Sequence, residues 1–288
     1  MLLFKKVSDL KKYISSAKIK GQKVGFVPTM GALHAGHLSL LERATNDCDI
    51  VVCSIFVNPT QFNDPKDLEK YPRTEAADIE LLNAVSCDVL FLPDVAEIYP
   101  PNLDLELNID FGSLTEVMEG RFRKGHFEGM ATVVKRLLDI VEPDFLYMGQ
   151  KDFQQFSIVQ QMIGKFGNKV RLVMGDTVRE TDGLAMSSRN TRLSPTLRKM
   201  AHFIYEALLK AKEMMLHSGP AEIEKWGMNE LSLPNFKPEY FEIVDGRTLQ
   251  PVKDFHQHDF VVACVATWLG DVRLIDNIVM KEPSADMQ

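Results

Sequence analysis

Two histidines three residues apart mark the stretch of this sequence that is best suited to chemistry. His34 and His37 follow a short apolar run at residues 24–27 and precede a helical pattern that begins at Leu38. Residues three apart on a helix share a face, so both imidazole rings can point at the same object. The start of a helix also carries unpaired N–H groups and a partial positive charge, which favour an anion. The spacing therefore predicts a strand, a loop and a helix N-terminus that bind a phosphate group.

Gly36 separates the two histidines and has no Cβ atom, so a nucleotide can approach the backbone closely there. His-x-Gly-His in this setting resembles the nucleotide-binding signature of the adenylyl-transferring superfamily that includes class I aminoacyl-tRNA synthetases. Gly31 and Gly36 also have the spacing of a kinase-type phosphate loop, but His37 stands where that loop needs Lys, which excludes that class. A solvated helix face and a metal half-site are the alternatives for a histidine pair at this spacing.

Polar residues also follow two predicted strands, at residues 50–57 and 145–148. Asn58 and Gln61 come after the first of these strands, and Lys151 comes after the second. Ligands of α/β proteins bind at the carboxyl ends of parallel strands, so the amides can hydrogen-bond a ligand and the ammonium group can reach a phosphate. An ordinary Asn-Pro turn is the alternative for residues 58–62.

Two further segments carry groups that suit an anion. Beside Lys151, Gly149 frees the backbone, Asp152 is placed to cap the next helix and Gln155 lies on the first turn of that helix. Residues 186–190 (Met-Ser-Ser-Arg-Asn) combine two hydroxyls and a guanidinium, which suit a triphosphate tail, and resemble the mobile Lys-Met-Ser-Lys-Ser signature of the same superfamily. Residues 119–127 form a basic loop with glycines, for which a solvated surface loop is the alternative.

The elements that must position these residues alternate between strands and helices through residue 175. Apolar runs predict further strands at residues 24–27, 88–92 and 170–174, and helical periodicity predicts helices at residues 74–85, 127–141 and 153–166. This alternation predicts an α/β fold with a parallel sheet that has helices on both faces.

The pattern changes after Gly175. One long amphipathic helix is predicted from Pro195 to Leu216, and strands are predicted at residues 240–244, 260–268 and 272–275. Because no helices separate these strands, we expect a smaller C-terminal α+β domain with an antiparallel sheet. The predicted domains are residues 1–176 and residues 177–288.

Composition limits the partners and the compartment. The chain of 288 residues is 45% hydrophobic and 25% charged, as soluble globular proteins are, and its net charge of −7 argues against a general nucleic-acid surface. No run approaches the roughly 20 apolar residues of a membrane span. The four cysteines, Cys48, Cys53, Cys87 and Cys264, lack zinc spacing and are expected to be buried free thiols. We therefore expect a cytoplasmic protein that binds neither nucleic acid nor membranes.

Taken in order, five segments resemble the pantoate–β-alanine ligase family over nearly the whole chain. They are residues 28–37 (Pro-Thr-Met-Gly-Ala-Leu-His-Ala-Gly-His), 56–62 (Phe-Val-Asn-Pro-Thr-Gln-Phe), 125–129 (Gly-His-Phe-Glu-Gly), 151–155 (Lys-Asp-Phe-Gln-Gln) and 186–190. Five ordered motifs are far more specific than any one of them. Two positions depart from the family pattern, because Lys124 stands where Pro is usual and Gln150 stands where Glu is common.

The resemblance implies an ATP-dependent condensation of (R)-pantoate with β-alanine through a pantoyl-adenylate. It implies a homodimer that uses Mg²⁺ bound mainly through ATP oxygens, with no protein ligand to the metal assigned. It also implies a Rossmann-like domain at residues 1–176 that binds ATP and pantoate, and a domain at residues 177–288 that closes over the ATP site.

The same resemblance assigns residues to roles. The implied catalytic residues are His34, His37 and Lys151, with His37 as the donor near the reacting phosphoryl group. The implied ATP-binding residues are Met30, Gly31, Ala32, Leu33, His34, Ala35, Gly36, His37, Gly149, Gln150, Lys151, Asp152, Val178, Met186, Ser187, Ser188 and Arg189. The implied pantoate-binding residues are Asn58, Gln61, Phe62 and Gln155.

Two other functions stay open on the sequence alone. A nucleotidyltransferase of the same superfamily would carry a similar first signature but would not need residues 58–62 together with Gln155. A non-catalytic nucleotide-binding regulator would not need both histidines, Lys151 and Arg189, because a sensor stabilises no transition state. Formation of AMP that requires both pantoate and β-alanine would distinguish the three functions.

Overall fold

A computed structural model describes residues 1–62, 65–101, 103, 107, 109–167 and 169–283. The chain forms two compact units. The first contains Met1–Phe111, Arg123–Gln150 and Gln155–Asp176, and the second contains Gly112–Phe122, Lys151–Gln154 and Thr177–Gln288. Two short segments from the first 176 residues thus belong to the second unit, and one of them carries Lys151.

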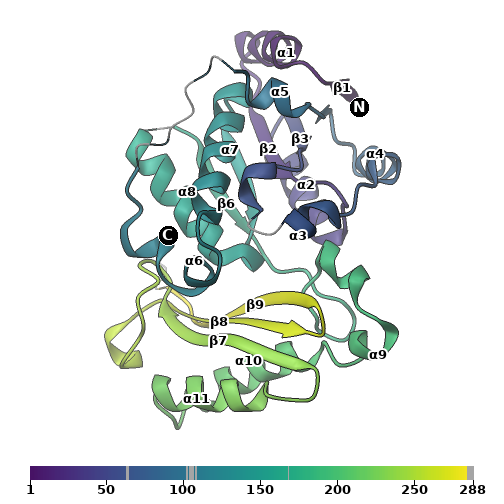
Figure 1. The fold of residues 1–288 in the computed structure, drawn as a ribbon. Helices are drawn as coiled ribbons and strands as arrows, with labels where there is room; N and C mark the ends of the chain where they lie inside the picture. The colour runs from purple at the N-terminus through teal and green to yellow at the C-terminus, as the bar shows by residue number, and fades with distance from the viewer. Residues whose placement is uncertain (63–64, 102, 104–106, 108, 168, 284–288) are drawn as a thin grey trace. The chain divides into compact units, whose positions relative to one another are not determined.

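The first unit is built on a six-stranded parallel sheet, which confirms the predicted α/β fold (Figure 1). Its strands are β1 (Leu2–Phe4), β2 (Val24–Thr29), β3 (Ile50–Ile55), β4 (Val89–Phe91), β5 (Phe145–Gly149) and β6 (Arg171–Gly175), in the order β1-β4-β3-β2-β5-β6. The strand order reverses direction between β2 and β5, and α/β sheets bind ligands at such a switch point. The motifs at residues 28–37 and 149–155 follow these two strands.

Helices cover both faces of this sheet, as predicted. All six residues of β3 are buried, which is expected of a strand that is covered on both sides. On one face, α2 (Ala35–Asp47) and α4 (Glu75–Ala84) pack on Val51 and Cys53 in a hydrophobic cluster. Val52 points to the opposite face, where α7 (His126–Val141) packs on β2 and on α1 (Val7–Ile19).

The remaining helices of the α/β part complete the connections between strands. They are α3 (Pro65–Glu69), α5 (Val95–Ile98) and α8 (Phe153–Phe166). The sequence analysis missed α1 and the short edge strand β1. It also ended the first strand at Val27, whereas β2 runs through Pro28 to Thr29. Pro28 is tolerated because β2 pairs with β5 only at Gly25 and Phe26, so no hydrogen bond to β5 is lost at the proline.

The second unit contains an antiparallel three-stranded sheet, which confirms the predicted α+β character of this part of the chain. Its strands β7 (Phe236–Asp245), β8 (Val261–Leu269) and β9 (Val272–Lys281) lie in chain order. Figure 1 shows α10 (Phe203–Met214) and α11 (Pro220–Glu230) alongside this sheet, and both pack on its strands. The short helix α6 (Met118–Phe122) also belongs to this unit.

The single long helix predicted at residues 195–216 is wrong. The chain forms α9 (Pro195–Arg198), then a turn, and then α10. In the turn, the N–H groups of Met200 and Ala201 donate to carbonyls three residues back, which tightens the backbone locally. This arrangement buries both Ala201 and Ile204 in the core of the second unit. The predicted start is confirmed, because the Ser194 hydroxyl accepts from Leu197 N–H.

Two further expectations concern the cysteines and membranes. All four cysteines are free thiols, with Cys53, Cys87 and Cys264 buried and Cys48 half-buried. Burial raises the pKa of the Cys87 thiol to about 11, so it is protonated at neutral pH. Within the described part of the chain, no helix has the length and apolar character needed to cross a membrane.

Candidate active site

The loop after β2 is held in shape by one buried carboxylate. Gly31 and Ala32 both have positive φ, at 78° and 48°, so the chain turns sharply as it leaves the sheet. The N–H groups of Ala32 and Leu33 donate to the two oxygens of Asp78 on α4, at 2.9 and 2.8 Å. The Thr74 hydroxyl donates to the same carboxylate, which is 1% exposed. The backbone N–H groups of Ala32 and Leu33 are therefore hydrogen-bonded within the protein.

His34 and His37 are brought together at the N-terminus of α2. Gly36 N–H donates to Nδ1 of His34 at 3.2 Å, and the backbone N–H of His34 donates to Nδ1 of His37 at 3.3 Å. The ring centroids lie 4.1 Å apart. Because each Nδ1 accepts a hydrogen bond, the proton of each neutral ring sits on Nε2. Both rings thus have an N–H donor on the side away from the backbone.

Asn58 is fully engaged within the protein. Its Nδ2 donates to Gln61 Oε1 at 3.1 Å and to the Gly129 carbonyl at 3.2 Å. Its Oδ1 accepts from the Tyr99 hydroxyl at 2.8 Å and from Thr60. The side chain is 1% exposed. One of these bonds holds Gln61 Oε1, and the ligand contact that the sequence predicts for Asn58 stays a prediction.

Residues 125–129 pack against the turn that carries Gln61. His126 Nδ1 lies 2.8 Å from the Gln61 carbonyl, to which it donates. A Cβ atom at Gly129 would lie 2.3 Å from the Thr60 carbonyl oxygen, so only glycine allows this approach. His126 and Phe127 are buried, so the alternative of a solvated surface loop is wrong for these residues. Phe62, which ends the same turn, packs edge-on against Tyr71.

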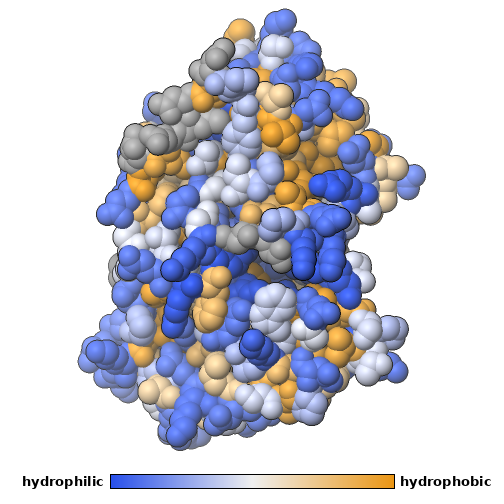
Figure 2. All heavy atoms as spheres, viewed as in Figure 1, coloured by the Kyte–Doolittle hydropathy of each residue, from blue (hydrophilic) through white to orange (hydrophobic). Residues whose placement is uncertain are grey.

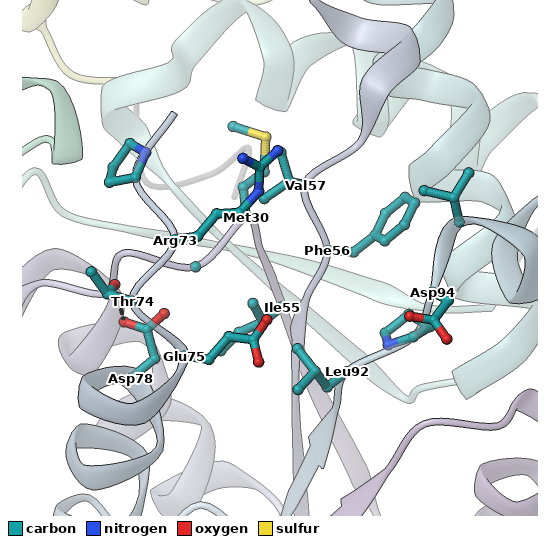
Figure 3. Close-up of a pocket in the computed structure, with 14 residues that line it drawn as sticks. Met30, Ile55, Phe56, Val57, Arg73, Thr74, Glu75, Asp78, Leu92 and Asp94 are labelled. Carbon is teal, nitrogen blue, oxygen red and sulfur yellow. Dashed lines mark hydrogen bonds between the residues drawn. The ribbon is translucent and has the colours of Figure 1, made fainter. Parts of the chain in front are cut away.

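A pocket opens at the carboxyl ends of β2, β3 and β4 (Figure 3). In this view the apolar side chain of Leu92 lies between the carboxylates of Glu75 and Asp94. The pocket has a cavity volume of about 220 Å³. Figure 2 shows hydrophobic side chains gathered on the surface between α5 and α3 of the first unit, next to segments that line this pocket. Of the predicted site residues, Met30 and Gly31 line it, whereas Gln61 and Phe62 do not.

Lys151 lies in a 3₁₀ turn, Gln150–Asp152, directly after β5. Its ammonium group is 4.0 Å from the Asp152 carboxylate. Its backbone carbonyl accepts a hydrogen bond of 2.9 Å from Nδ2 of Asn277 on β9. Gln155, one turn later on α8, is half-buried.

Residues 178–189 form one loop that gathers the remaining predicted residues. Met186 N–H donates to the Val178 carbonyl at 3.0 Å, so these two residues lie side by side. The Ser187 hydroxyl accepts from Arg189 N–H at 3.2 Å and begins the 3₁₀ turn Ser188–Arg192. Asn190 is buried and donates to the Ala185 carbonyl, which ties the turn to the preceding strand-like segment.

A buried ion pair fixes this loop to β9. Arg179 donates to both oxygens of Asp276, at 2.6 and 3.0 Å, and its guanidinium lies 3.7 Å from the ring centroid of Tyr205. Burial raises the pKa of Asp276, while Arg179 opposes that shift. Sequence reasoning missed Asp78, Asp276 and Asn277. No motif signals them, because each acts on a loop far away along the chain.

Each unit carries groups whose chemistry suits an anion. The first contains two imidazole N–H groups, and the second contains an ammonium group, two serine hydroxyls and a guanidinium. Among the residues that the structure describes, no three His, Cys, Asp or Glu side chains cluster as metal ligands.

The chain matches the family model described as pantoate-beta-alanine ligase over residues 2–279. It is 46% identical to a pantothenate synthetase from Porphyromonas gingivalis, over 96% of this chain and 99% of the relative. A crystal structure of pantothenate synthetase from Thermus thermophilus superposes with a TM-score of 0.91 at 41% identity, covering 98% of this chain and all of that chain.

A second solved structure is a pantoate-beta-alanine ligase from Francisella tularensis complexed with beta-gamma ATP and β-alanine. It superposes with a TM-score of 0.80 at 36% identity and covers 97% of this chain and 98% of that chain. Sequence and fold agree over almost the whole length. The chain therefore belongs to the pantoate–β-alanine ligase family.

Proposed function

We propose that this chain condenses (R)-pantoate with β-alanine at the expense of ATP, and that the residues assigned above perform the reaction. The observation that carries the assignment is the histidine pair at the N-terminus of α2. Their Nδ1 atoms accept from backbone N–H groups, so Nε2–H is the group through which each ring would bind an anion. Family membership over residues 2–279 and the ligands of the Francisella relative support the choice of substrates.

The chemistry needs an activated carboxyl group. A carboxylate resists attack by an amine, because its charge repels the nucleophile and oxide is a very poor leaving group. Attack of the pantoate carboxylate on the α-phosphorus of ATP gives a pantoyl-adenylate and releases pyrophosphate. The β-alanine amine then attacks the acyl carbon and displaces AMP, so an amide bond forms and an acyl phosphate bond breaks. Negative charge builds on the phosphoryl oxygens during the first step.

The roles of the donors follow from where that charge develops. His34 and His37 face the triphosphate, and His37 donates near the reacting phosphoryl group. Lys151 neutralises the α-phosphoryl region. The hydroxyls of Ser187 and Ser188 and the Arg189 guanidinium hold the tail of the triphosphate. Met30, Gly149, Asp152, Val178 and Met186 surround the adenosine, while Gly31, Ala32, Leu33, Ala35, Gly36 and Gln150 supply the backbone around ATP.

Pantoate is held by neutral amides. Gln61 and Gln155 bind its hydroxyls and carboxylate, and Phe62 provides an apolar wall for its gem-dimethyl group. Asn58 acts behind Gln61, whose Oε1 it holds at 3.1 Å. Orienting Gln61 in this way keeps its Nε2 on a fixed side of the turn, where it contacts Met30 Sδ at 2.9 Å.

The expected Mg²⁺ and the homodimer belong to the same proposal. Mg²⁺ prefers oxygen ligands in octahedral geometry and is commonly held by phosphates with one or two carboxylates. The described residues form no cluster of three metal ligands, so they do not suit a cage built by the protein alone. ATP oxygens would carry the metal, and no step above depends on it. The homodimer is the assembly that the family implies.

The test replaces His37 by alanine. We expect kcat for pantoyl-adenylate formation to fall by about 10² to 10³, because one transition-state donor is lost, while ATP binding weakens only modestly. Exchange of pyrophosphate into ATP in the presence of pantoate measures the first step, and calorimetry measures ATP binding. Near-wild-type exchange would remove His37 from the proposed role. Release of pyrophosphate with a stable nucleotidyl product and no AMP would favour a nucleotidyltransferase instead.

A further inference from the structure

Two consecutive polar residues interrupt the apolar strand β9. Asp276 and Asn277 are 3% and 2% exposed, and their neighbours along the strand are Ile275 and Ile278. Burying a carboxylate and an amide costs free energy unless both are hydrogen-bonded. In this unit their partners are the Lys151 turn and the loop at residues 178–189. These are the two segments of the second unit to which the proposed function assigns ATP contacts.

We propose that Asp276 and Asn277 are positioning residues for adenylate formation, because they hold the Lys151 turn and the residue 178–189 loop in one fixed frame. This inference rests on the proposed function, in which Lys151 and residues 187–189 contact ATP. Neither residue is assigned a contact with substrate. Each acts through a loop to which the proposed function assigns a contact with ATP.

Asn277 holds the Lys151 turn through its side chain. Its Nδ2 donates to the Lys151 carbonyl at 2.9 Å. The strand pairing fixes Asn277 opposite Cys264 of the central strand β8, so the backbone of Asn277 cannot move without the strand. A short 3₁₀ turn has few bonds of its own, and a bond from a rigid sheet therefore defines where the Lys151 backbone lies.

Asp276 holds the other loop and supports Asn277 as well. Its two oxygens accept from Arg179, and Oδ1 also accepts from the Asn277 backbone N–H at 2.8 Å. Arg179 in turn donates to the Asn277 carbonyl at 3.3 Å and to the Gly183 carbonyl at 3.1 Å. The guanidinium thus ties β9 to the turn at Gly183 within the residue 178–189 loop.

The Lys151 turn and the Arg179–Asp276 ion pair also interact electrostatically. The Lys151 ammonium group lies close enough to Asp276 to lower the pKa of that carboxyl, although burial and Arg179 have the larger effects. The turn that carries the cation proposed to neutralise the phosphoryl group and the loop proposed to hold the triphosphate tail are therefore fixed by the same dipeptide. Placing donors in advance avoids reorganisation at the moment of reaction, which is the main source of electrostatic catalysis.

The experiment is a double-mutant cycle between Asn277→Ala and Lys151→Ala. If Asn277 acts through Lys151, Asn277→Ala lowers the pantoate-dependent exchange of pyrophosphate into ATP by about tenfold or more, because a small misplacement of a reacting group is costly. The same substitution in the Lys151→Ala background then adds less than about twofold. Aminolysis of preformed pantoyl-adenylate by β-alanine stays within about threefold of wild type, since that step does not use the triphosphate contacts.

Three further variants guard the interpretation. Asn277→Leu fills the same volume without a donor and gives the same result if Asn277→Ala folds poorly. Asp276→Asn keeps the shape but removes the charge that holds Arg179, and it lowers exchange with the same selectivity. Thr267→Val alters a buried residue of β8 whose hydroxyl bonds only to the neighbouring Trp268 carbonyl among its described partners, and it leaves exchange unchanged.

The outcomes separate the two proposals. Equal losses in both half-reactions, or effects of Asn277→Ala and Lys151→Ala that multiply, would show a purely structural role and overturn the inference alone. Full exchange activity in Lys151→Ala would overturn the proposed role of Lys151, and the inference with it.

Discussion

The loop after β2 and the loop at residues 178–189 are fixed by different physics. In the first, a buried carboxylate accepts two backbone N–H groups, and two histidines accept from the backbone of their own turn. In the second, a buried carboxylate is paired with a full positive charge from Arg179. Removing one partner should therefore destabilise the second loop more than the first, because an unpaired buried charge costs more free energy than an unpaired buried amide.

The largest effect is expected where the ion pair is broken. Arg179→Met leaves Asp276 buried without its counter-charge and should lower the free energy of unfolding by about 3–5 kcal/mol. Arg179→Met combined with Asp276→Leu removes both charges and should recover most of that loss. Urea unfolding of the three variants measures this. Equal destabilisation of the single and the double variant would show that packing on Tyr205, not charge, holds the loop.

A smaller effect is expected when the carboxylate behind the histidine loop is removed. Asp78→Ala leaves the N–H groups of Ala32 and Leu33 without this acceptor and should lower the free energy of unfolding by about 2–3 kcal/mol. Because the loop leads into His34, pyrophosphate exchange should fall as well. Asp78→Asn should lie between alanine and wild type, since its Oδ1 can still accept one of the two N–H groups.

Glu80→Ala is the matched control for Asp78, because Glu80 is exposed on the same helix α4. It should change neither unfolding nor exchange. If Asp78→Ala lowers stability but leaves exchange at the wild-type rate, the carboxylate supports the fold without setting the position of His34.

The same contrast explains what the sequence could predict. The N-terminus of α2 is shaped largely by His34, Gly36 and His37, so local spacing predicted the helix start there, whereas Asp78, which holds the preceding loop from α4, was missed. The parallel sheet was also predictable, because runs such as β3 are apolar on both faces. Asp276 acts on Arg179 from 97 residues away along the chain, and no local pattern records such a pairing.

The prediction of one helix at residues 195–216 was wrong for a related reason. The pattern of apolar residues from Pro195 to Leu216 fits a continuous helix, yet tighter turns at Met200 and Ala201 break it. Those turns are favoured by packing onto the sheet of the second unit, a tertiary effect that periodicity does not contain. Asn58 was placed correctly at a strand end, but its partners Tyr99 and Gly129 come from distant segments that only the fold brings close.

The smallest effect is expected at a second ion pair, which joins the residue 178–189 loop to α9 and differs from Arg179–Asp276 chiefly in exposure. Asp182 and Arg198 form a two-point contact, but about a third of each side chain is exposed. The hydrogen bond from Arg198 lowers the pKa of Asp182 below its ordinary value of 3.8. Asp182→Asn should therefore cost about 0.5 kcal/mol, and at most about 1 kcal/mol, at neutral pH.

The pH dependence of that small cost follows from the direction of the shift. A lowered carboxyl pKa stabilises the folded state above the unfolded pKa, and the contribution is lost as the pH falls through the folded pKa. The difference in unfolding free energy between wild type and Asp182→Asn should thus be present above pH 3.8 and shrink toward zero below it. High salt should shrink it too, because exposed charges are screened. If Asp182→Asn instead costs as much as Arg179→Met, burial is not what separates the two pairs, and the contrast between the two loops must have another origin.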